Sequence, residues 1–578
     1  MTPMCIGAQP TRLVLCRAYY VGVVPKPVRE RQGPERTSPS LRERLPPIHC
    51  LLTACFLVHR PSSIVRRPSS VVGRRSGLLP FCFLPWRSSG RLWGFVFEDF
   101  LMDGQHNGPA IGVAPKGLAI LAVVGPSMVW AAEYIGSGEV IIATRTGAVL
   151  GTAVLWAVVL GVFLKFWIGM AAARYTVCTG EGMIDMFARA PGPRNWAVWV
   201  VMVVQLFCAV LATGTLATAA ARFMHSLVPA VPVWAHGLAA VILAASVVWS
   251  GTFDTLKMVM SGFVLIIVIG AIYIAAHVFP PVTELLAGLT LRLPEIPEWA
   301  RAIDTVSDNP WEEVMPVLGW GAGGFASQVW YTYWVIGAGY GATAGRGYGR
   351  AADEGMLRTM STETARKIKG WCTVLYTDST CAMLLGVLVT AAFLICGAGI
   401  LGVAHEAPSD ANMADTLARV FSSRWNVFGG FLFKLCGAVA MVSTLTGQLA
   451  GWPRLLADSC RLTIPGFGRR LAWKTQFHLF LAFFFCTTVA VVFVLGGHII
   501  FLLKISSILE GLLLIALQAA LVGIGLFVVM RRMLSAEAWR VLKPSPVFAV
   551  GLLVTFLFFG YICVTQVPAT LCRLVGGK

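Results

Sequence analysis

The sequence predicts an all-helical protein that crosses a membrane about eleven times, and three observations lead to this fold class. Hydrophobic residues make up 57% of the 578-residue chain and charged residues only 13%, roughly half the charged share of soluble domains. Apolar runs of about 20 residues or more, enough to span a bilayer, recur along the chain. Basic residues gather in alternate connections, as in loops that face the cytoplasm. An ordinary soluble enzyme is therefore excluded.

The predicted spans fall into two groups of five. Spans 1 to 5 form repeat one (118–279), spans 6 to 10 form repeat two (313–530), and span 11 (546–567) is an extra helix. We expect one transmembrane domain over residues 102–570. Apolar runs bounded by charges, Gly or Pro give the individual limits as 118–148, 152–173, 196–221, 232–250, 257–279, 313–343, 371–400, 425–450, 475–495, 499–530 and 546–567.

Loop charges predict the orientation of these spans. The loops after spans 6, 8 and 10 are basic, whereas residues 280–313 carry seven acidic side chains against two arginines. Basic loops remain in the cytoplasm. We therefore expect a cytoplasmic N-terminus, an external C-terminus and a location in the plasma (inner) membrane.

The first 101 residues are a basic, low-complexity extension with fifteen Arg and Lys against five Asp and Glu. They contain the near-repeat HRPSSIV and RRPSSVV. A disordered arm, a targeting segment and translated upstream sequence are the three open interpretations. We favour the last, because Met102 opens a short polar lead before the first span. More than half of the net charge of +18 lies in this extension and the remainder follows the basic loops of the membrane pattern, so no nucleic-acid partner is expected.

Motifs for enzymatic chemistry are absent from the sequence. There is no G-x-x-x-x-G-K-[ST] loop, so no ATP-binding site is predicted. The fifteen cysteines include no C-x-x-C pair, and the nine histidines are scattered. We therefore predict no cofactor, no structural metal and no catalytic site.

Span 1 has a weak centre that carries two carboxylates. Gly136, Ser137 and Gly138 stand between Glu133 and Glu139. Six residues of continuous helix turn through about 600°, so one carboxylate would face lipid at a cost of roughly 2.5 to 3.5 kcal/mol. A broken helix removes this conflict, because unwound backbone can line a polar cavity. The alternative is that the glycines only allow close helix packing.

Span 6 has a similar weak centre, from Gly321 to Gly324, followed by Ser327 and Gln328. Interrupted helices at corresponding places in two halves are typical of inverted-repeat transporters, whose site lies at the membrane midplane. The two spans therefore predict secondary transport of an ion or a small solute.

Residues 125–182 resemble the Nramp (natural resistance-associated macrophage protein) family of divalent-metal transporters. The resemblance rests on the Gly-Pro start of span 1, its broken centre, and the segment ARYTVCTGEG at the end of span 2. It implies a LeuT-like 5+5 inverted-repeat fold and proton-coupled symport of Mn- or Fe-type cations.

The predicted site departs from the family pattern. The family motif Asp-Pro-Gly-Asn corresponds to Gly136, Ser137, Gly138 and Glu139, so a carboxylate has moved by three residues. The family's Met-Pro-His segment in span 6 has no counterpart here. Oxygen ligands suit Mg, Ca or Mn better than the later transition metals. We therefore expect a divergent member with an altered site for Mg, Mn, Fe or Ca.

The predicted ion- or substrate-binding residues come from the two interruptions, and Glu139 is the expected metal ligand. A second group of buried ionisable residues is costly in a membrane and therefore expected to be functional. Pairing of Glu133 or Glu139 with a lysine, fixed ion pairs, and lysines that reach the interface are all open for this group. The binding set is Gly136, Ser137, Gly138, Glu139, Ala322, Gly323, Gly324, Ser327 and Gln328, and the relay set is Glu133, Lys165, Asp378, Lys504 and Glu510.

Three functional hypotheses follow. The first is a secondary active transporter of a divalent metal cation, coupled to protons as the resemblance implies. The second is a transporter of an amino acid or another small organic solute on the same fold, with its carboxylate at a helix N-terminus. The third is a membrane-embedded enzyme or a receptor that no longer transports.

Overall fold

The computed structural model describes residues 111–250 and 254–576, and every regular element in these ranges is helical. The prediction of an all-α protein is confirmed. Eight described stretches are long and apolar enough to cross a membrane. The eight include the interrupted span 10 (Ile499–Met533), and one of them joins the second part of span 1 to span 2 (Gly138–Thr179), whereas neither half of span 6 is among them. The number of eleven spans therefore stays a prediction. The predicted extension, residues 1–101, lies outside the described residues.

The longer helices agree with the predicted spans to within a few residues at most ends, and short helices connect them. The longer helices are α2 (Pro126–Tyr134), α3 (Thr144–Leu150), α4 (Leu155–Thr179), α6 (Trp196–Leu227), α7 (Val233–Ser250), α8 (Asp254–His277), α11 (Trp311–Trp320), α12 (Phe325–Ala338), α14 (Thr362–Cys396), α15 (Met413–Thr463), α17 (Trp473–Leu495), α18 (Ile499–Gly511), α19 (Ile515–Ile524), α22 (Pro546–Thr565) and α23 (Val567–Gly576). The shorter ones are α5 (Met183–Ala188), α9 (Val282–Ala287), α10 (Glu298–Arg301), α13 (Glu354–Arg358), α16 (Phe467–Arg470), α20 (Met530–Met533) and α21 (Ala536–Leu542).

The predicted interruption of span 1 is present. The chain bends at Ile135 and Gly136 after α2, and it then continues as a π-helical turn, η2 (Gly138–Ala143), into α3. The Ile135 carbonyl accepts a hydrogen bond from the Thr444 hydroxyl of α15 at 3.4 Å. A side chain of another helix thus replaces part of the lost helical bonding.

The second predicted interruption is also present, and a third was not predicted. Residues 321–324 separate α11 from α12, and Ala322 (φ 53°) and Gly323 (φ 83°) adopt left-handed backbone conformations there. Alanine rarely occupies this region, so the surrounding contacts hold it in place. Residues 512–514 interrupt span 10 between α18 and α19.

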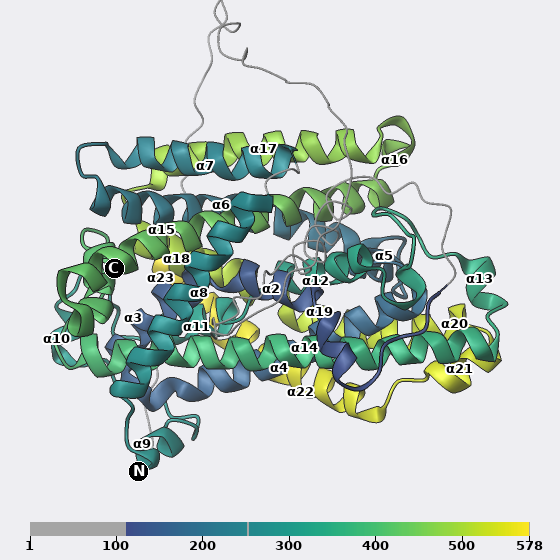
Figure 1. Cartoon of the computed structure of the whole chain (residues 1–578), viewed down its shortest axis with the longest axis horizontal. Helices are drawn as coiled ribbons and strands as arrows, with labels where there is room; N and C mark the ends of the chain where they lie inside the picture. Colours follow the sequence, from purple (N-terminus) through teal and green to yellow (C-terminus); the bar gives the residue numbers. More distant parts are fainter. Residues whose placement is uncertain (1–110, 251–253, 577–578) are drawn as a thin grey trace, which may run out of the picture. The chain divides into compact units, whose positions relative to one another are not determined.

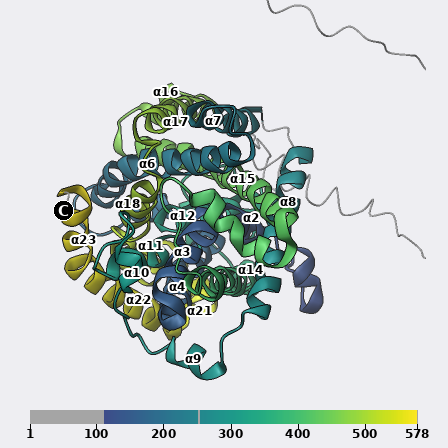
Figure 2. The same ribbon diagram turned by 90° about the vertical axis from the view of Figure 1, so that its left-hand side faces the viewer.

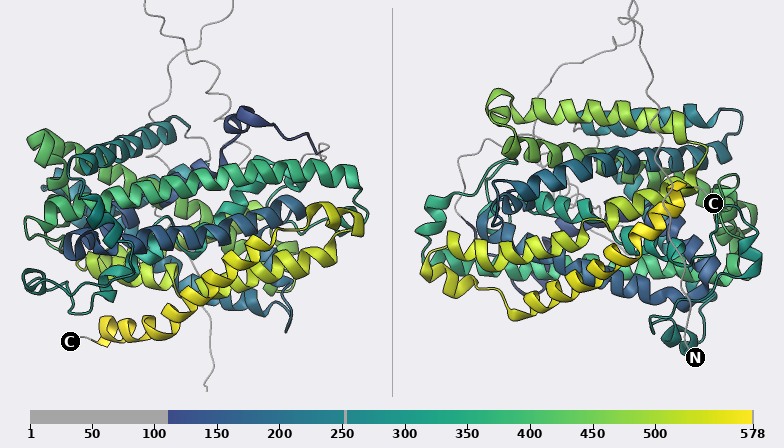
Figure 3. Two further views of the ribbon diagram at one scale, coloured as in Figure 1. Left: turned by 90° about the horizontal axis from the view of Figure 1, so that it is seen from below. Right: turned by 180° about the vertical axis from the view of Figure 1, so that it is seen from behind.

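The interrupted helices lie inside a bundle of continuous ones (Figures 1 and 2). α7 and α17 lie side by side along one edge, and α6 and α15 form the next layer. α4 and α14 pack together along the opposite side, and α22 crosses beside α4 and α19 (Figure 3). α15 is kinked at Trp425 and Asn426, where the predicted span 8 begins.

Connections that were predicted to share one side of the membrane lie together. Arg189, after span 2, forms an ion pair at 2.8 Å with Glu354, after span 6. The Ser535 N–H, after span 10, donates to a carbonyl of α13 at 3.0 Å. At the other end, the Arg145 side chain of α3 donates to the Pro408 carbonyl, after span 7. Which end faces the cytoplasm stays a prediction.

Candidate functional site

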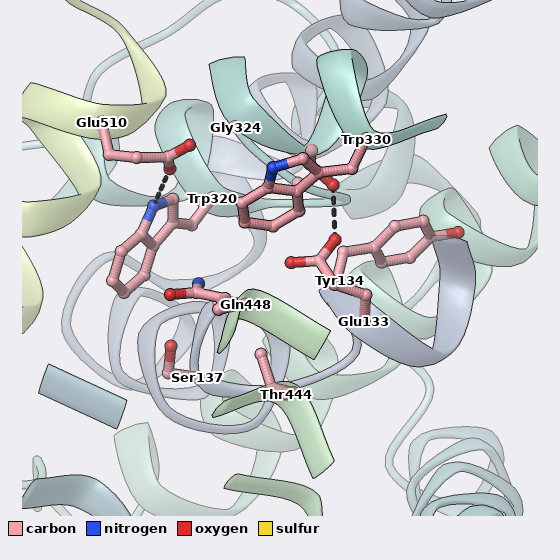
Figure 4. A pocket seen from close by; sticks show the side chains of 12 residues that line it. Glu133, Tyr134, Ser137, Trp320, Gly324, Trp330, Thr444, Gln448 and Glu510 are labelled. Atoms are coloured by element: carbon pink, nitrogen blue, oxygen red, sulfur yellow. Dashed lines mark hydrogen bonds between the residues drawn. The ribbon is translucent and has the colours of Figure 1, made fainter. Parts of the chain in front are cut away.

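A small cavity lies where the two interrupted helices meet (Figure 4). Residues from α2, η2, α11, α12, α15 and α18 line it, with those of the breaks themselves. Its wall combines carboxylates, hydroxyls, one amide and three aromatic rings. The lining residues are Glu133, Tyr134, Ser137, Gly138, Trp320, Gly323, Gly324, Ser327, Trp330, Thr444, Gln448 and Glu510.

Four charged side chains lie in or beside this cavity, and we call them the central cluster: Glu133, Glu139, Lys165 and Glu510. Each is at most 6% exposed. Lys165 is close enough to Glu139 and Glu510 to interact electrostatically with both. In the described part of the chain, Lys165 forms no ion pair with Glu133, Glu139 or Glu510. Neutral groups therefore hold these charges in place.

Glu139 connects the two breaks. Its Oε2 accepts the Gly136 N–H at 3.1 Å, and its Oε1 accepts the Ala322 N–H at 2.8 Å. The Thr390 hydroxyl of α14 approaches Oε1 at 3.5 Å. The side chain is fully buried, and both oxygens are bonded to backbone amides in this conformation. The prediction that Glu139 binds the metal stays a prediction.

Lys165 of α4 holds the carbonyl groups of the second break. Its Nζ donates to the carbonyl oxygens of Gly319 at 3.0 Å, Gly321 at 2.6 Å and Gly323 at 2.7 Å. Those carbonyls lie at the C-terminal end of α11 and in the loop after it, where the helix dipole is negative. An ammonium group has three N–H donors, and all three are used.

Glu510 of α18 caps the beginning of α12. Its Oε1 accepts the Ala326 N–H at 3.0 Å, and its Oε2 accepts the indole N–H of Trp320. The free N–H groups of a helix N-terminus favour a negative charge. Gly324 leaves room for this carboxylate, because a Cβ there would lie 2.3 Å from Oε2.

Glu133 of α2 is the cluster member with an oxygen to spare. Its Oε2 accepts the Ser327 hydroxyl at 2.6 Å, and that hydroxyl accepts the Trp130 indole N–H at 2.8 Å. No described hydrogen bond reaches Oε1 of Glu133. Across the cavity, the side-chain oxygen of Gln448 is buried without a hydrogen-bond partner, and Figure 4 shows the amide projecting among the lining residues.

Three members of the predicted relay set do not line the cavity: Lys165, described above, Asp378 and Lys504. Asp378 of α14 caps α2, because its carboxylate accepts the Gly125 and Ser127 N–H groups at 3.1 and 3.0 Å and the Tyr331 hydroxyl at 2.8 Å. Lys504 of α18 forms an ion pair with Glu313 of α11 at 2.8 Å rather than with Glu133 or Glu139.

Glu313 also binds Arg145 of α3 at 2.9 Å. We call Arg145, Glu313 and Lys504 the end triad. All three side chains are at most 6% exposed. The Lys504 ammonium and the Arg145 guanidinium each also donate to the Thr305 carbonyl, at 2.9 and 3.0 Å. The triad therefore joins both interrupted helices to α18.

The structure brings together most of the predicted binding set and adds residues that sequence analysis missed. Ser137, Gly138, Gly323, Gly324 and Ser327 line the cavity. Gln328 of α12 points elsewhere, and its Oε1 is buried beside Gly169 without a partner. The missed residues are Tyr134, Trp320, Trp330, Thr444 and Gln448. A lone glutamine in the apolar run of span 8 was the available signal for Gln448.

Sulfur and imidazole ligands are missing from the cavity wall. Within the described ranges, no group of three or more His, Cys, Asp or Glu side chains is placed to hold a metal ion. The cavity instead offers oxygen atoms from carboxylate, amide, hydroxyl and backbone groups. Such donors fit hard divalent cations.

Sequence comparisons find similarity to a known family in the first part of the helical region. A family model described as natural resistance-associated macrophage protein-like (Nramp) matches residues 127–305. The divalent metal cation transporter MntH of Burkholderia ambifaria is 25% identical over 220 residues, 36% of this chain and 48% of that protein. MntH of Yersinia enterocolitica is 32% identical over 81 residues, 14% of this chain and 20% of that protein. The matched segment thus spans at most about half the length of these relatives.

Comparison with solved structures covers a longer part of the chain. A mutant of the manganese transporter of Eremococcus coleocola superposes with a TM-score of 0.51 and 15% identity, over 81% of this chain and 99% of that one. The same transporter in complex with an aromatic bis-isothiourea compound gives a TM-score of 0.50 over 82% and 100%. The likeness confirms the predicted LeuT-like membrane fold.

Proposed function

We propose that the chain is a divergent member of the Nramp family, which its first spans resemble, and that it is a secondary transporter of a divalent metal cation. The formal charge of the central cluster is the observation that carries this proposal. Three carboxylates and one ammonium leave two negative charges around a buried cavity. Uncompensated charge at membrane depth is costly, and one divalent cation would neutralise it.

We assign the ligands from the side chains that have oxygen atoms to spare. Glu133 would bind the cation through Oε1, and Gln448 would bind it through its unpartnered amide oxygen. Ser137 and Thr444 line the same wall and add hydroxyl oxygens. Glu139 and Glu510 would contribute charge from behind, since backbone amides hold both of them.

The orientation of the protein in the membrane and the coupling ion are part of the same proposal. The basic loops support a cytoplasmic N-terminus, and the proposed location is the plasma membrane. Protons are the proposed coupling ion, and the carboxylates of the central cluster are the groups available to carry them. Mg, Mn and Ca are the proposed cargo, because oxygen donors favour hard cations over the softer ions of the later transition series.

Uptake into proteoliposomes tests this function. Purified protein is reconstituted, and entry of Mg²⁺, Mn²⁺, Fe²⁺, Ca²⁺ and Zn²⁺ is measured with and without a pH gradient. We expect uptake of at least one hard cation, and Glu133→Gln should reduce it at least tenfold because the ligand charge is lost. Glu363→Gln is the matched control, since Glu363 pairs with Lys367 at the exposed start of α14.

Two results would contradict the assignment. Cation uptake by Glu133→Gln at the wild-type rate would mean that Glu133 is not a ligand of the cargo. Displacement of bound cargo by amino acids, with no effect of divalent ions, would favour an organic solute. Three aromatic rings in the wall, those of Tyr134, Trp320 and Trp330, are the feature that suits this second candidate.

A further inference from the structure

Lys165 is bonded in the way that a dissociable metal ion would be. Its side chain is 1% exposed, and its three donors meet three backbone carbonyl oxygens at 2.6 to 3.0 Å. All three oxygens belong to the break between α11 and α12. We call these three carbonyls the carbonyl cage, formed by Gly319, Gly321 and Gly323.

Convergent carbonyl groups of unwound helices are the usual ligands of monovalent coupling cations in transporters built on broken helices. Rings of backbone carbonyls also replace the water shell of alkali ions in selective pores. The cage holds a single positive charge, and its oxygens have lost the helical N–H partners that they would have in a continuous helix. A cation of charge +1 therefore satisfies it.

We propose that Lys165 is a tethered substitute for an alkali cation, and that its ammonium occupies a monovalent cation site in the second break. Because the ammonium is covalently attached to α4 through the Lys165 side chain, the three carbonyls can converge on a positive charge without an ion from solution. The proposed cargo site near Glu133 and Gln448 is a separate set of residues, because Lys165 does not line that cavity. The proposal goes beyond the proposed function, and its thermal test needs no cargo.

The proposal makes a gain-of-function prediction for Lys165→Met. Methionine keeps a flexible apolar stem but removes the ammonium, so the three carbonyls lose their donors. A small cation from solution should then enter the cage and stabilise the folded state by mass action. Purified variants are unfolded thermally in NaCl, KCl or N-methyl-D-glucamine chloride, each at ~0.3 M so that ionic screening is equal. The large organic cation of the third salt cannot fit into the carbonyl cage.

We expect the wild-type protein to unfold at the same temperature in all three salts. Lys165→Met should unfold earlier than wild type in the organic salt, and Na⁺ or K⁺ should raise its unfolding temperature by at least about 3 °C. Lys434→Met is the matched control. Lys434 is also in a predicted span, but it pairs with Asp415, so its loss should create no alkali dependence.

Each of the other results overturns the proposal. Equal unfolding temperatures of Lys165→Met in the three salts would mean that no alkali cation enters the cage. Failure of Lys165→Met to fold in any of the salts would count against it in the same way, because Na⁺ or K⁺ should replace the ammonium. An alkali-dependent wild type would show that Lys165 does not fill the site.

If wild-type protein transports a divalent cation, the uptake assay provides a second test of the carbonyl cage. Cargo uptake by Lys165→Met should depend on Na⁺ or K⁺, whereas uptake by wild type should not. If no divalent cation is transported at all, the proposed function fails while the thermal result for the cage still stands. The two failures are therefore distinguishable.

Discussion

The central cluster and the end triad are both buried groups of charges, but they are satisfied in different ways. In the end triad, Glu313 binds Arg145 at 2.9 Å and Lys504 at 2.8 Å, so charge meets charge. In the central cluster, Lys165 binds carbonyls and Glu139 binds amides, so charge meets neutral dipoles. The first arrangement fixes helices to one another. The second leaves net charge available to a cargo ion.

From this difference we expect the end triad to govern stability and the central cluster to govern ion binding. A paired charge that loses its partner is left uncompensated, and the penalty appears in the free energy of unfolding. A charge held by neutral dipoles can be removed with less structural loss, and the penalty appears in ion binding. Substitutions in each cluster therefore separate the two roles.

The largest effect on stability is expected for Glu313→Gln. Two buried cations, Arg145 and Lys504, would lose their common anion, at a cost of about 3 to 5 kcal/mol in the free energy of unfolding. Chemical or thermal unfolding of the purified variant measures this loss. Glu363→Gln is the control, because Glu363 pairs with Lys367 at the exposed start of α14 and takes no part in the triad. Equal losses in the two variants would contradict the role of the triad.

An intermediate effect is expected for Glu139→Gln. The amide has one acceptor oxygen, so either the Gly136 or the Ala322 N–H would face an NH₂ group. We expect a loss of about 1 to 3 kcal/mol in unfolding free energy, together with loss of cation uptake. Both are measured on the same reconstituted protein. Normal uptake by this variant would remove Glu139 from the transport site.

The smallest effect is expected for an ion pair outside both clusters. Arg189 hydrogen-bonds to Glu354 and lowers the pKa of that carboxyl below its ordinary value of 4.5. A lowered pKa stabilises the folded protein above about pH 4.5, and this contribution disappears as the pH falls through the lowered pKa. Because Glu354 is exposed, the contribution should be at most about 1 kcal/mol. Unfolding of wild type and Glu354→Gln at pH 7 and at pH 4 measures it, and a larger gap at pH 4 than at pH 7 would be the wrong sign.

Glycine composition was enough to predict two of the three breaks. The runs Gly136-Ser137-Gly138 and Gly321 to Gly324 are poor helix formers, and both sites are interrupted. The break at residues 512–514 consists of leucines, which favour helix, so it could not be predicted from local sequence. It follows Gly511, whose backbone packs directly on that of Gly319. Tertiary contact, not local preference, is associated with this third break.

The partners of the buried charges were the part that sequence could not supply. Lys165 binds backbone carbonyls, and a carbonyl has no residue identity to recognise. Lys504 pairs with Glu313, which lies 191 positions away in the chain, and the span limits placed Glu313 at the edge of an acidic loop. Gln448 could have been noticed as a lone polar residue, but only the folded chain shows that it lines the same cavity as Glu133.

The break in span 10 places its two halves, α18 and α19, against different helices. α18 packs against α11 and is joined to it by Lys504, whereas α19 packs against α22. α18 also packs against α6. Residues 512–514 join α18 to α19, and Glu510 lies in the last turn of α18 before them. The break therefore lets one segment of sequence cap α12 through Glu510 and then pack against α22.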